Sequence, residues 1–178
     1  MRLLILFATT EGQTRKIAHF VAERVEAAGH MAIVVDATEV PADFAIPPVD
    51  AAIVAGSVHV GRYQSALAHV VKKNREGLLA IPTLFLSVSL AAAGDDGDIE
   101  DVDACVARFV RESGWTPGRV QHVAGAFRYT EYDFFKRWAM KYIAFRHGQP
   151  TDTGRDYELT DWGALEKAVE DFLGYAGG

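Results

Sequence analysis

Short, continuous hydrophobic runs alternate along the chain with longer stretches in which hydrophobic residues recur at helical spacing. The first run, Leu3 to Phe7 (LLILF), is typical of a strand buried on both faces. A helical pattern follows and stops at Gly29, a residue type common just after a helix end. The hydrophobic positions of that predicted helix are Ile17, Phe20, Val21, Val25 and Ala28. The chain therefore opens with a strand, a loop and an amphipathic helix.

Four further hydrophobic runs predict four more strands. They cover Met31 to Val35, Ala51 to Ala55, Thr83 to Ser89 and Val120 to Phe127. Helical patterns lie between or after them, over Ser65 to Arg75, around Cys105 and over residues 161–173. Alternating strands and helices favour right-handed crossovers and a parallel sheet covered on both faces. We expect an α/β, doubly wound, five-stranded parallel sheet with strand order 2-1-3-4-5.

The chain length and the absence of a linker predict one domain over residues 1–178. Residues 128–156, between the fifth strand and the last helix, are far longer than an ordinary βα loop. We interpret them as an insert with its own helix, placed before the last helix of the domain.

Composition limits the classes of function. Hydrophobic residues make up 49% and charged residues 24%, as in globular proteins, and the net charge of −6 argues against nucleic-acid binding. Cys105 is the single cysteine, so it forms no internal disulfide, and we favour a small core residue over a reactive thiol. No spacing of cysteines and histidines predicts a metal site. No hydrophobic run reaches the roughly 18 residues of a membrane span.

The loop between the first strand and the first helix carries the clearest candidate chemistry. Its residues 9–14 read TTEGQT, with three hydroxyls around one glycine. In an open parallel sheet, ligands bind beyond the carboxyl ends of the strands, where this loop would lie. A helix beginning near Thr14 would direct free N–H groups there, and Gly12 would let the backbone approach a ligand closely. The loop therefore resembles a phosphate cradle.

The loop matches neither common nucleotide motif. The dinucleotide pattern G-x-G-x-x-G is absent, and no Gly-Lys-Ser/Thr completes a Walker loop. Hydroxyls and amides without a lysine suit a retained cofactor monophosphate. The alternative is structural: the threonines would only cap the helix.

Several segments together resemble a known family. LILFATTEGQTRKIA at the start of the chain resembles the phosphate loop of flavodoxins in general. Together with GSVHVGRYQSALAHVVKKN, SVSLAAA, VAGAFRY and the late TDW, it is similar to the menaquinone-dependent protoporphyrinogen IX dehydrogenases of bacteria. The resemblance implies a flavodoxin-like fold, non-covalent FMN, oxidation of protoporphyrinogen IX to protoporphyrin IX in haem biosynthesis, and a quinone as electron acceptor.

The resemblance also implies positions for the cofactor. Three loops would hold FMN: the phosphate loop, a loop beside the isoalloxazine ring, and a loop on the other side of that ring. Their residues are Thr9, Thr10, Glu11, Gly12, Gln13, Thr14, then Ser57, Val58, His59, and finally Ser87, Val88, Ser89, Leu90, Ala91 and Ala92.

The chain departs from that family in two places. His59 stands where the family has an arginine, and residues 95–103 are acidic where the family is basic. If those basic groups receive porphyrin propionates, the departures leave the substrate open without affecting flavin binding.

The insert contains a basic and aromatic stretch. Residues 132–147 read YDFFKRWAMKYIAFRH, with a broad hydrophobic face at helical spacing. One interpretation is a helix packed on its own domain with lysines extended to solvent. A second is peripheral contact with an anionic membrane. A third is the roof of a pocket for a large, flat, anionic substrate, with aromatic faces against a tetrapyrrole and cations on its carboxylates.

The expected catalytic chemistry belongs to the flavin, and no residue stands out as a required acid or base. Our candidates for substrate contact are His59, Arg62, Arg128, Tyr129, Arg137, Trp138 and Lys141. We expect a cytoplasmic protein, with the inner face of the cell membrane as the place of any peripheral contact. The competing hypothesis is a flavodoxin-type one-electron carrier without a small-molecule substrate, whose acidic surface would dock on basic partners.

Overall fold

A central parallel sheet organises the molecule. The computed structural model describes residues 1–93, 96–127 and 157–178. In the sheet the strands lie in the order β2-β1-β3-β4-β5 and every neighbouring pair is parallel. The strands are β1 (Arg2–Ala8), β2 (Met31–Asp36), β3 (Ala51–Ser57), β4 (Thr83–Ser89) and β5 (Arg119–Ala124). The predicted fold class and strand order are confirmed.

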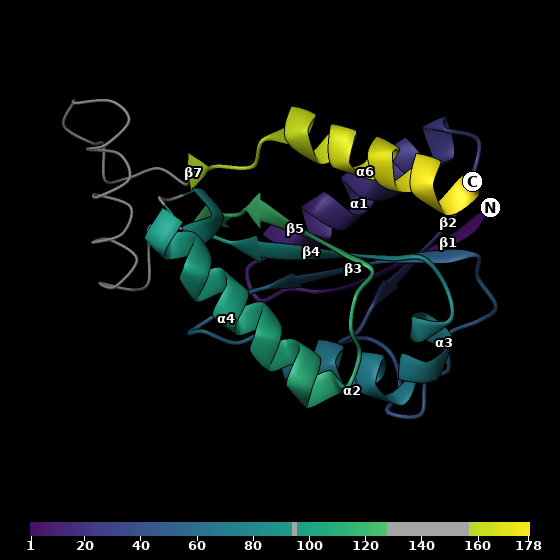
Figure 1. Cartoon of the computed structure of the whole chain (residues 1–178), viewed down its shortest axis with the longest axis horizontal. Coiled ribbons are helices and arrows are strands. Elements are labelled where there is room, and N and C mark those ends of the chain that lie inside the picture. Colours follow the sequence, from purple (N-terminus) through teal and green to yellow (C-terminus); the bar gives the residue numbers. More distant parts are fainter. Residues whose placement is uncertain (94–95, 128–156) are drawn as a thin grey trace.

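Helices cover both faces of this sheet (Figure 1). On one face lie α1 (Gln13–Ala27) and α6 (Trp162–Gly177). On the other lie α2 (Ser65–Lys73), α3 (Arg75–Leu79) and α4 (Asp96–Ser113). A single 3₁₀ turn, η1 (Ala91–Ala93), follows β4. None of the helices in these described ranges is long and apolar enough to cross a membrane.

The continuous hydrophobic run of β1 serves two cores at once. Leu3 and Ile5 pack in the layer with α1 and α6, whereas Leu4 and Leu6 pack in the layer with α2 and α4. All four side chains are fully buried. Successive side chains of a strand point to opposite faces, so a strand between two helical layers needs hydrophobic residues at every position.

The carboxyl ends of the strands gather on one side of the molecule. In Figure 1 the arrowheads of β4 and β5 point toward the side on which β7 (Tyr157–Glu158) lies, away from the two chain termini. The order reverses at β1, because β2 lies on one side of it and β3 on the other. This is the place at which open α/β sheets bind ligands.

The end of β3 lies close to α2. A Cβ added to Gly56 would lie 2.7 Å from Leu67 Cδ2 and 2.9 Å from Tyr63 Cδ1. Only glycine fits there without moving those side chains. The first turn of α2 is thereby packed directly against the end of β3.

The fifth strand is shorter than the sequence predicts. Instead of one strand over Val120 to Phe127, β5 ends at Ala124, and β6 (Ala126–Phe127) pairs antiparallel with β7. Gly125 separates them: its N–H donates to the Ser89 carbonyl, and its carbonyl accepts from Leu159 N–H. The chain thus leaves the main sheet at Gly125, and the predicted insert, residues 128–156, lies outside the described residues.

The predicted helix over Ser65 to Arg75 is also divided. Asn74 ends α2, and its side chain bonds outward to the preceding loop: Oδ1 accepts from Ile46 N–H and Nδ2 donates to the Phe44 carbonyl. Nδ2 also donates to the Val70 carbonyl one turn earlier, a local side-chain bond of the kind that competes with helix continuation.

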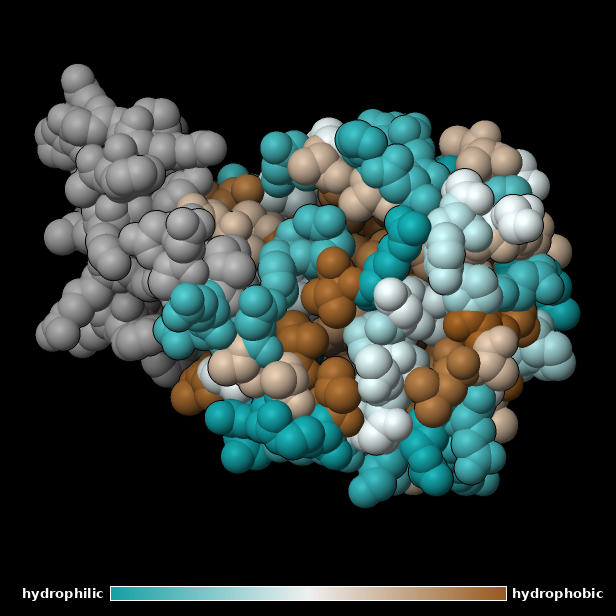
Figure 2. Space-filling view, in the orientation of Figure 1, coloured by the Kyte–Doolittle hydropathy of each residue, from teal (hydrophilic) through white to brown (hydrophobic). Residues whose placement is uncertain are grey.

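Figure 2 shows hydrophobic side chains between α6 and α4, where β5 forms the edge of the sheet. Val120 on this strand is exposed. Because β5 is the last strand of the sheet, its outer edge has no neighbouring strand among the described residues.

Candidate functional site

A cleft lies at the carboxyl ends of β1, β3, β4 and β5. It is open to solvent, and the empty space between its walls, measured out into the solvent, is about 440 Å³. Four chain segments form its walls. Its lining residues are Thr9, Thr10, Glu11, Gln13, Thr14, Ser57, Val58, His59, Val88, Ser89, Leu90, Gly125 and Ala126.

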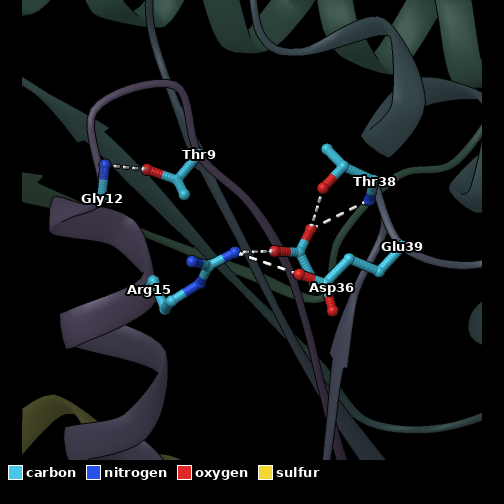
Figure 3. Close-up of polar contacts among 6 residues, drawn as sticks. All are labelled: Thr9, Gly12, Arg15, Asp36, Thr38 and Glu39. Carbon is cyan, nitrogen blue, oxygen red and sulfur yellow. Dashed lines mark hydrogen bonds and ion pairs between the residues drawn. The ribbon is translucent and has the colours of Figure 1, made fainter.

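The predicted phosphate loop, residues 9–14, forms a tight turn into α1. The Gly12 N–H donates to Thr9 Oγ1 at 2.9 Å, and Gly12 itself adopts φ 92°, a left-handed conformation that favours glycine (Figure 3). Thr9 therefore shapes the loop before the helix begins. No side chain caps α1, so the structural alternative, in which threonines serve as helix caps, is wrong.

Thr14 provides the test of whether a phosphate fits this loop. Its residue is fully buried, and its Oγ1 has no hydrogen-bond partner among the described residues. A buried hydroxyl without a partner is costly, and the uncapped first turn directs N–H groups and a partial positive charge to the same place. A phosphate monoester would satisfy both, so the residues present fit the phosphate of FMN.

The nearest arginine on α1 is engaged elsewhere. Arg15 Nη2 contacts Asp36 Oδ2 at 2.7 Å and Glu39 Oε1 at 3.3 Å, so its guanidinium is directed toward these two carboxylates (Figure 3). Burial raises the pKa of Asp36, but hydrogen bonds from Thr38 and Arg15 outweigh it and the pKa is lowered. Asp36 therefore stays ionised and holds Arg15, which leaves hydroxyls and amides to contact a ligand phosphate.

The second wall, Ser57 to His59, leads from the end of β3 into a two-residue turn. His59 and Arg62 exchange backbone hydrogen bonds across it, and Val60 (φ 49°) and Gly61 (φ 72°) occupy its centre. Positive φ at both central positions defines a type I′ turn, and valine is strained in that conformation. The Gly61 carbonyl accepts from Cys105 Sγ and Arg108 Nη1 of α4, which hold the turn from behind.

Two residues near this wall belong to the core instead. The Tyr63 and Ser87 side-chain hydroxyls are hydrogen-bonded at 2.8 Å, and both residues are buried. Tyr63 packs edge-on against Phe85 and Phe109, with ring centroids 5.1 Å away in each case. Burial raises the pKa of Tyr63, so its hydroxyl stays neutral. Tyr63 is therefore a core residue that supports the start of α2 and does not line the cleft.

The third wall, around Ser89, belongs to β4 and its continuation. Val88, Ser89 and Leu90 line the cleft, and Ser89 Oγ accepts from Ala92 N–H, which turns the chain into η1.

The fourth wall was not predicted from the sequence. Gly125 and Ala126 line the cleft where the chain passes from β5 to β6. Thr160 holds this junction: its Oγ1 donates to the Ala124 carbonyl at 2.7 Å and accepts from Gln13 Nε2 at 2.9 Å. The wall is therefore bonded to the first residue of α1. The small size of these two residues was the available signal in the sequence. Their position at the cleft follows only from the fold.

The structure brings together most of the residues expected around a cofactor. All of the three predicted loops contribute, but four of the predicted residues are absent from the lining: Gly12, Ser87, Ala91 and Ala92. Gly12 shapes the loop, and the Ser87 side chain is bonded to Tyr63 in the core. Ala91 and Ala92 form η1 beside the cleft.

The predicted substrate contacts divide into two groups. His59 lines the cleft, whereas Arg62 is exposed and its Nη1 lies 3.8 Å from Glu112 Oε1. The others, Arg128, Tyr129, Arg137, Trp138 and Lys141, lie outside the described residues, as does the stretch 132–147. Within the described part of the chain, no three His, Cys, Asp or Glu side chains are grouped so that they could hold a metal ion.

Comparisons with known proteins agree with this geometry. The chain is 33% identical over 162 residues to the protoporphyrinogen IX dehydrogenase [quinone] of Escherichia coli strain K12, covering 91% of this chain and 89% of that protein. It is 27% identical over 180 residues to the protein of the same name from Leishmania major, covering 96% and 74%. These relatives are oxidoreductases by name, in agreement with the class of enzyme predicted from the sequence.

The fold has matches among solved structures. A single-site mutant of flavodoxin from Pseudomonas aeruginosa superimposes with a TM-score of 0.59 over the whole of both chains, at 14% identity. The flavodoxin domain family matches residues 4–154, and membership of that family implies FMN as the cofactor, as predicted. The chain therefore belongs to the flavodoxin domain family, in the branch that contains the quinone-linked protoporphyrinogen IX dehydrogenases.

Proposed function

We propose that the protein is an FMN-dependent oxidoreductase that oxidises protoporphyrinogen IX to protoporphyrin IX and passes the electrons to a quinone. The observation that carries this proposal is the similarity to the E. coli dehydrogenase over nearly the full length of both chains. The cleft supports it, because its lining meets the needs of the cofactor that the family implies.

The phosphate loop would hold the cofactor's phosphate. The Thr9 and Thr10 hydroxyls, the Thr14 hydroxyl and the free N–H groups of the first turn of α1 supply donors. None of these donors carries a charge. Because Arg15 is bound to Asp36, selectivity for a monophosphate would come from shape and hydrogen bonding.

The remaining walls would orient the ring system. The Ser57–His59 loop and the Val88–Leu90 loop face the same cleft, and the Gly125–Ala126 junction closes another side. Bound FMN would supply the redox chemistry. In the overall reaction six electrons and six protons leave the porphyrinogen, and three quinones take them up as quinols.

Substrate selection is the finer part of the proposal. His59 is the candidate contact that lines the cleft. The predicted contacts in 128–156, the pocket-roof or membrane role of 132–147, and a cytoplasmic location with peripheral membrane contact stay predictions. The acidic segment 95–103 and His59 distinguish this chain from the pattern that its resemblance implies.

Two measurements test the proposal in sequence. Titration calorimetry of the purified apoprotein with FMN should show one site per chain. The reconstituted protein, given protoporphyrinogen IX and a menaquinone analogue without oxygen, should form fluorescent protoporphyrin at a rate proportional to enzyme concentration. A protein that binds FMN but gives no turnover with several quinones contradicts the dehydrogenase and favours a flavodoxin-type electron carrier, for which the net charge of −6 would suit basic redox partners.

A further inference from the structure

One glutamine joins two walls of the cleft without lining it. Gln64 Nε2 lies 3.0 Å from Thr10 Oγ1 and 2.7 Å from Ser57 Oγ. An amide nitrogen carries two hydrogens, and here each is donated to a different loop. Thr10 belongs to the phosphate loop, Ser57 is the last residue of β3 where the ring-side loop begins, and both line the cleft.

Gln64 extends from a rigid support. Its backbone carbonyl accepts from Ala68 N–H, so the residue forms the start of α2. Leu67, one turn into that helix, packs against Gly56 at the end of β3 and is fully buried. The side chain is therefore held by a helix that is itself fixed to the sheet.

The side chain of Gln64 is directed toward the loops and away from its own helix. It makes no cap to α2, although residues at this position commonly bond back to the helix N–H groups. Its Oε1 is buried and accepts no hydrogen bond from the described residues. The two bonds from Nε2 are thus the polar contacts that fix its orientation.

We infer that Gln64 is a positioning residue that couples the phosphate loop to the ring-side loop, so that cofactor contacts made by Thr10 and by Ser57 depend on each other. The inference rests on the proposed binding of FMN in this cleft. Removing either hydroxyl frees the amide, and the opposite hydroxyl then loses its fixed orientation. Ordering of one loop by a ligand would in the same way order the other.

The test is a double-mutant cycle measured as FMN affinity by calorimetry. We expect Thr10→Val and Ser57→Ala each to weaken binding about tenfold, since each removes a ligand contact and its link to Gln64. The double variant should bind FMN more weakly than either single variant. Its loss of affinity should nevertheless be smaller than the hundredfold product of the two single losses, by about threefold or more. In the Gln64→Met background, which has the same length and no amide, the same two substitutions should combine as a product.

Riboflavin and a matched control separate positioning from general damage. Gln64→Met should weaken FMN more than riboflavin, because riboflavin lacks the phosphate that the Thr10 loop would hold. Gln121→Met, at an exposed position on β5, should leave both affinities unchanged. The melting temperature of each apoprotein shows whether a variant is folded, and Gln64→Leu, which likewise has no amide, replaces Gln64→Met if that variant is not.

The outcomes are distinct. Multiplicative effects of Thr10→Val and Ser57→Ala in the presence of Gln64 would overturn the coupling while leaving FMN binding intact. Equal losses for FMN and riboflavin in Gln64→Met would also contradict it. An unsubstituted apoprotein with no affinity for FMN would overturn the proposed function itself.

Discussion

At the scale of single residues, the buried hydroxyl of Thr14 is the feature that best supports phosphate binding. It is buried at the start of α1 without a hydrogen-bond partner among the described residues. Such a group costs about 1–3 kcal/mol relative to a satisfied one. Folding places it there nonetheless, which is expected where a ligand completes the bonding.

Thr14→Val should therefore change affinity and stability in different directions. Valine has nearly the same shape but no hydroxyl, so FMN should bind about tenfold more weakly, as expected for the loss of a bond to a charged group. The apoprotein should melt at the same temperature or higher, because no buried hydroxyl is left unsatisfied. Calorimetry with FMN and thermal unfolding of the apoprotein measure the two effects.

Thr83→Val is the matched control. Thr83 is also buried, but its Oγ1 accepts from Gly118 N–H at 2.9 Å and it lies at the start of β4, away from the cleft. This variant should lose stability and keep its FMN affinity. If Thr14→Val destabilises the apoprotein as Thr83→Val does, the hydroxyl of Thr14 has a structural partner and the argument for a phosphate there fails.

At the scale of elements, the Asp36 carboxylate fastens the end of β2 to the start of α1. It accepts from Thr38 N–H and Oγ1 and from Arg15 Nη2 (Figure 3). Its pKa is lowered in the folded protein, since these bonds outweigh the effect of burial. Strand and helix are thus joined by an ionised group whose contribution depends on pH.

The sign of this dependence follows from linkage. A carboxyl group whose pKa is lower in the folded chain stabilises the fold above its unfolded-state pKa, and the contribution is lost as pH falls through the folded-state value. We expect Asp36→Asn to lower the melting temperature by about 3 °C at pH 7 and the difference from the parent to shrink below the ordinary pKa of 3.8.

Thermal unfolding from pH 7 to pH 2.5 measures that difference. Asp43→Asn, which neutralises an exposed loop carboxylate, should show no comparable loss at pH 7. A constant difference for Asp36→Asn across the whole range would mean that the ionised state of Asp36 contributes nothing to folding.

The elements differ in how far their sequence reveals them. Leu3 to Phe7 is hydrophobic at every position, and this pattern has few outcomes besides a strand between two helical layers. The run VQHVAGAF is also rich in hydrophobic residues, yet its chain leaves the sheet at Gly125. The difference comes from hydrogen bonds of Gly125 to Ser89 and Leu159. Because Leu159 is distant in sequence, the local pattern of hydrophobic residues does not predict where the strand ends.

The same distinction separates the predicted and missed parts of the site. Thr9 to Thr14 could be found because a strand, a glycine and a helix adjoin in sequence. Gln64 and Ala126 could not, because their roles depend on which distant segment lies beside them.

At the scale of the whole molecule, the residues on either side of segment 128–156 pair with each other. Phe127 pairs with Tyr157 and Ala126 with Glu158. Lys16 of α1 forms an ion pair with Glu158, whose other oxygen accepts from Trp162 Nε1. The residues that flank the segment on either side are therefore joined to each other and to α1 and α6.

Deletion of residues 131–147 should consequently leave the cofactor site intact. We expect FMN affinity within about threefold of the parent, a change below about 1 kcal/mol, and loss of protoporphyrinogen oxidation, since the basic aromatic stretch is predicted to contact substrate or membrane. Calorimetry and the anaerobic fluorescence assay measure the two properties. Full activity after deletion would show that this stretch serves neither purpose.

The uncapped start of α1 has a consequence for the protein in a living cell. A ligand that binds only the native state stabilises it in proportion to its supply, and polypeptides with a larger unfolded fraction are removed faster by proteases. Riboflavin starvation should therefore shorten the lifetime of this protein, so that vitamin status sets its abundance even when its gene is expressed at a constant rate.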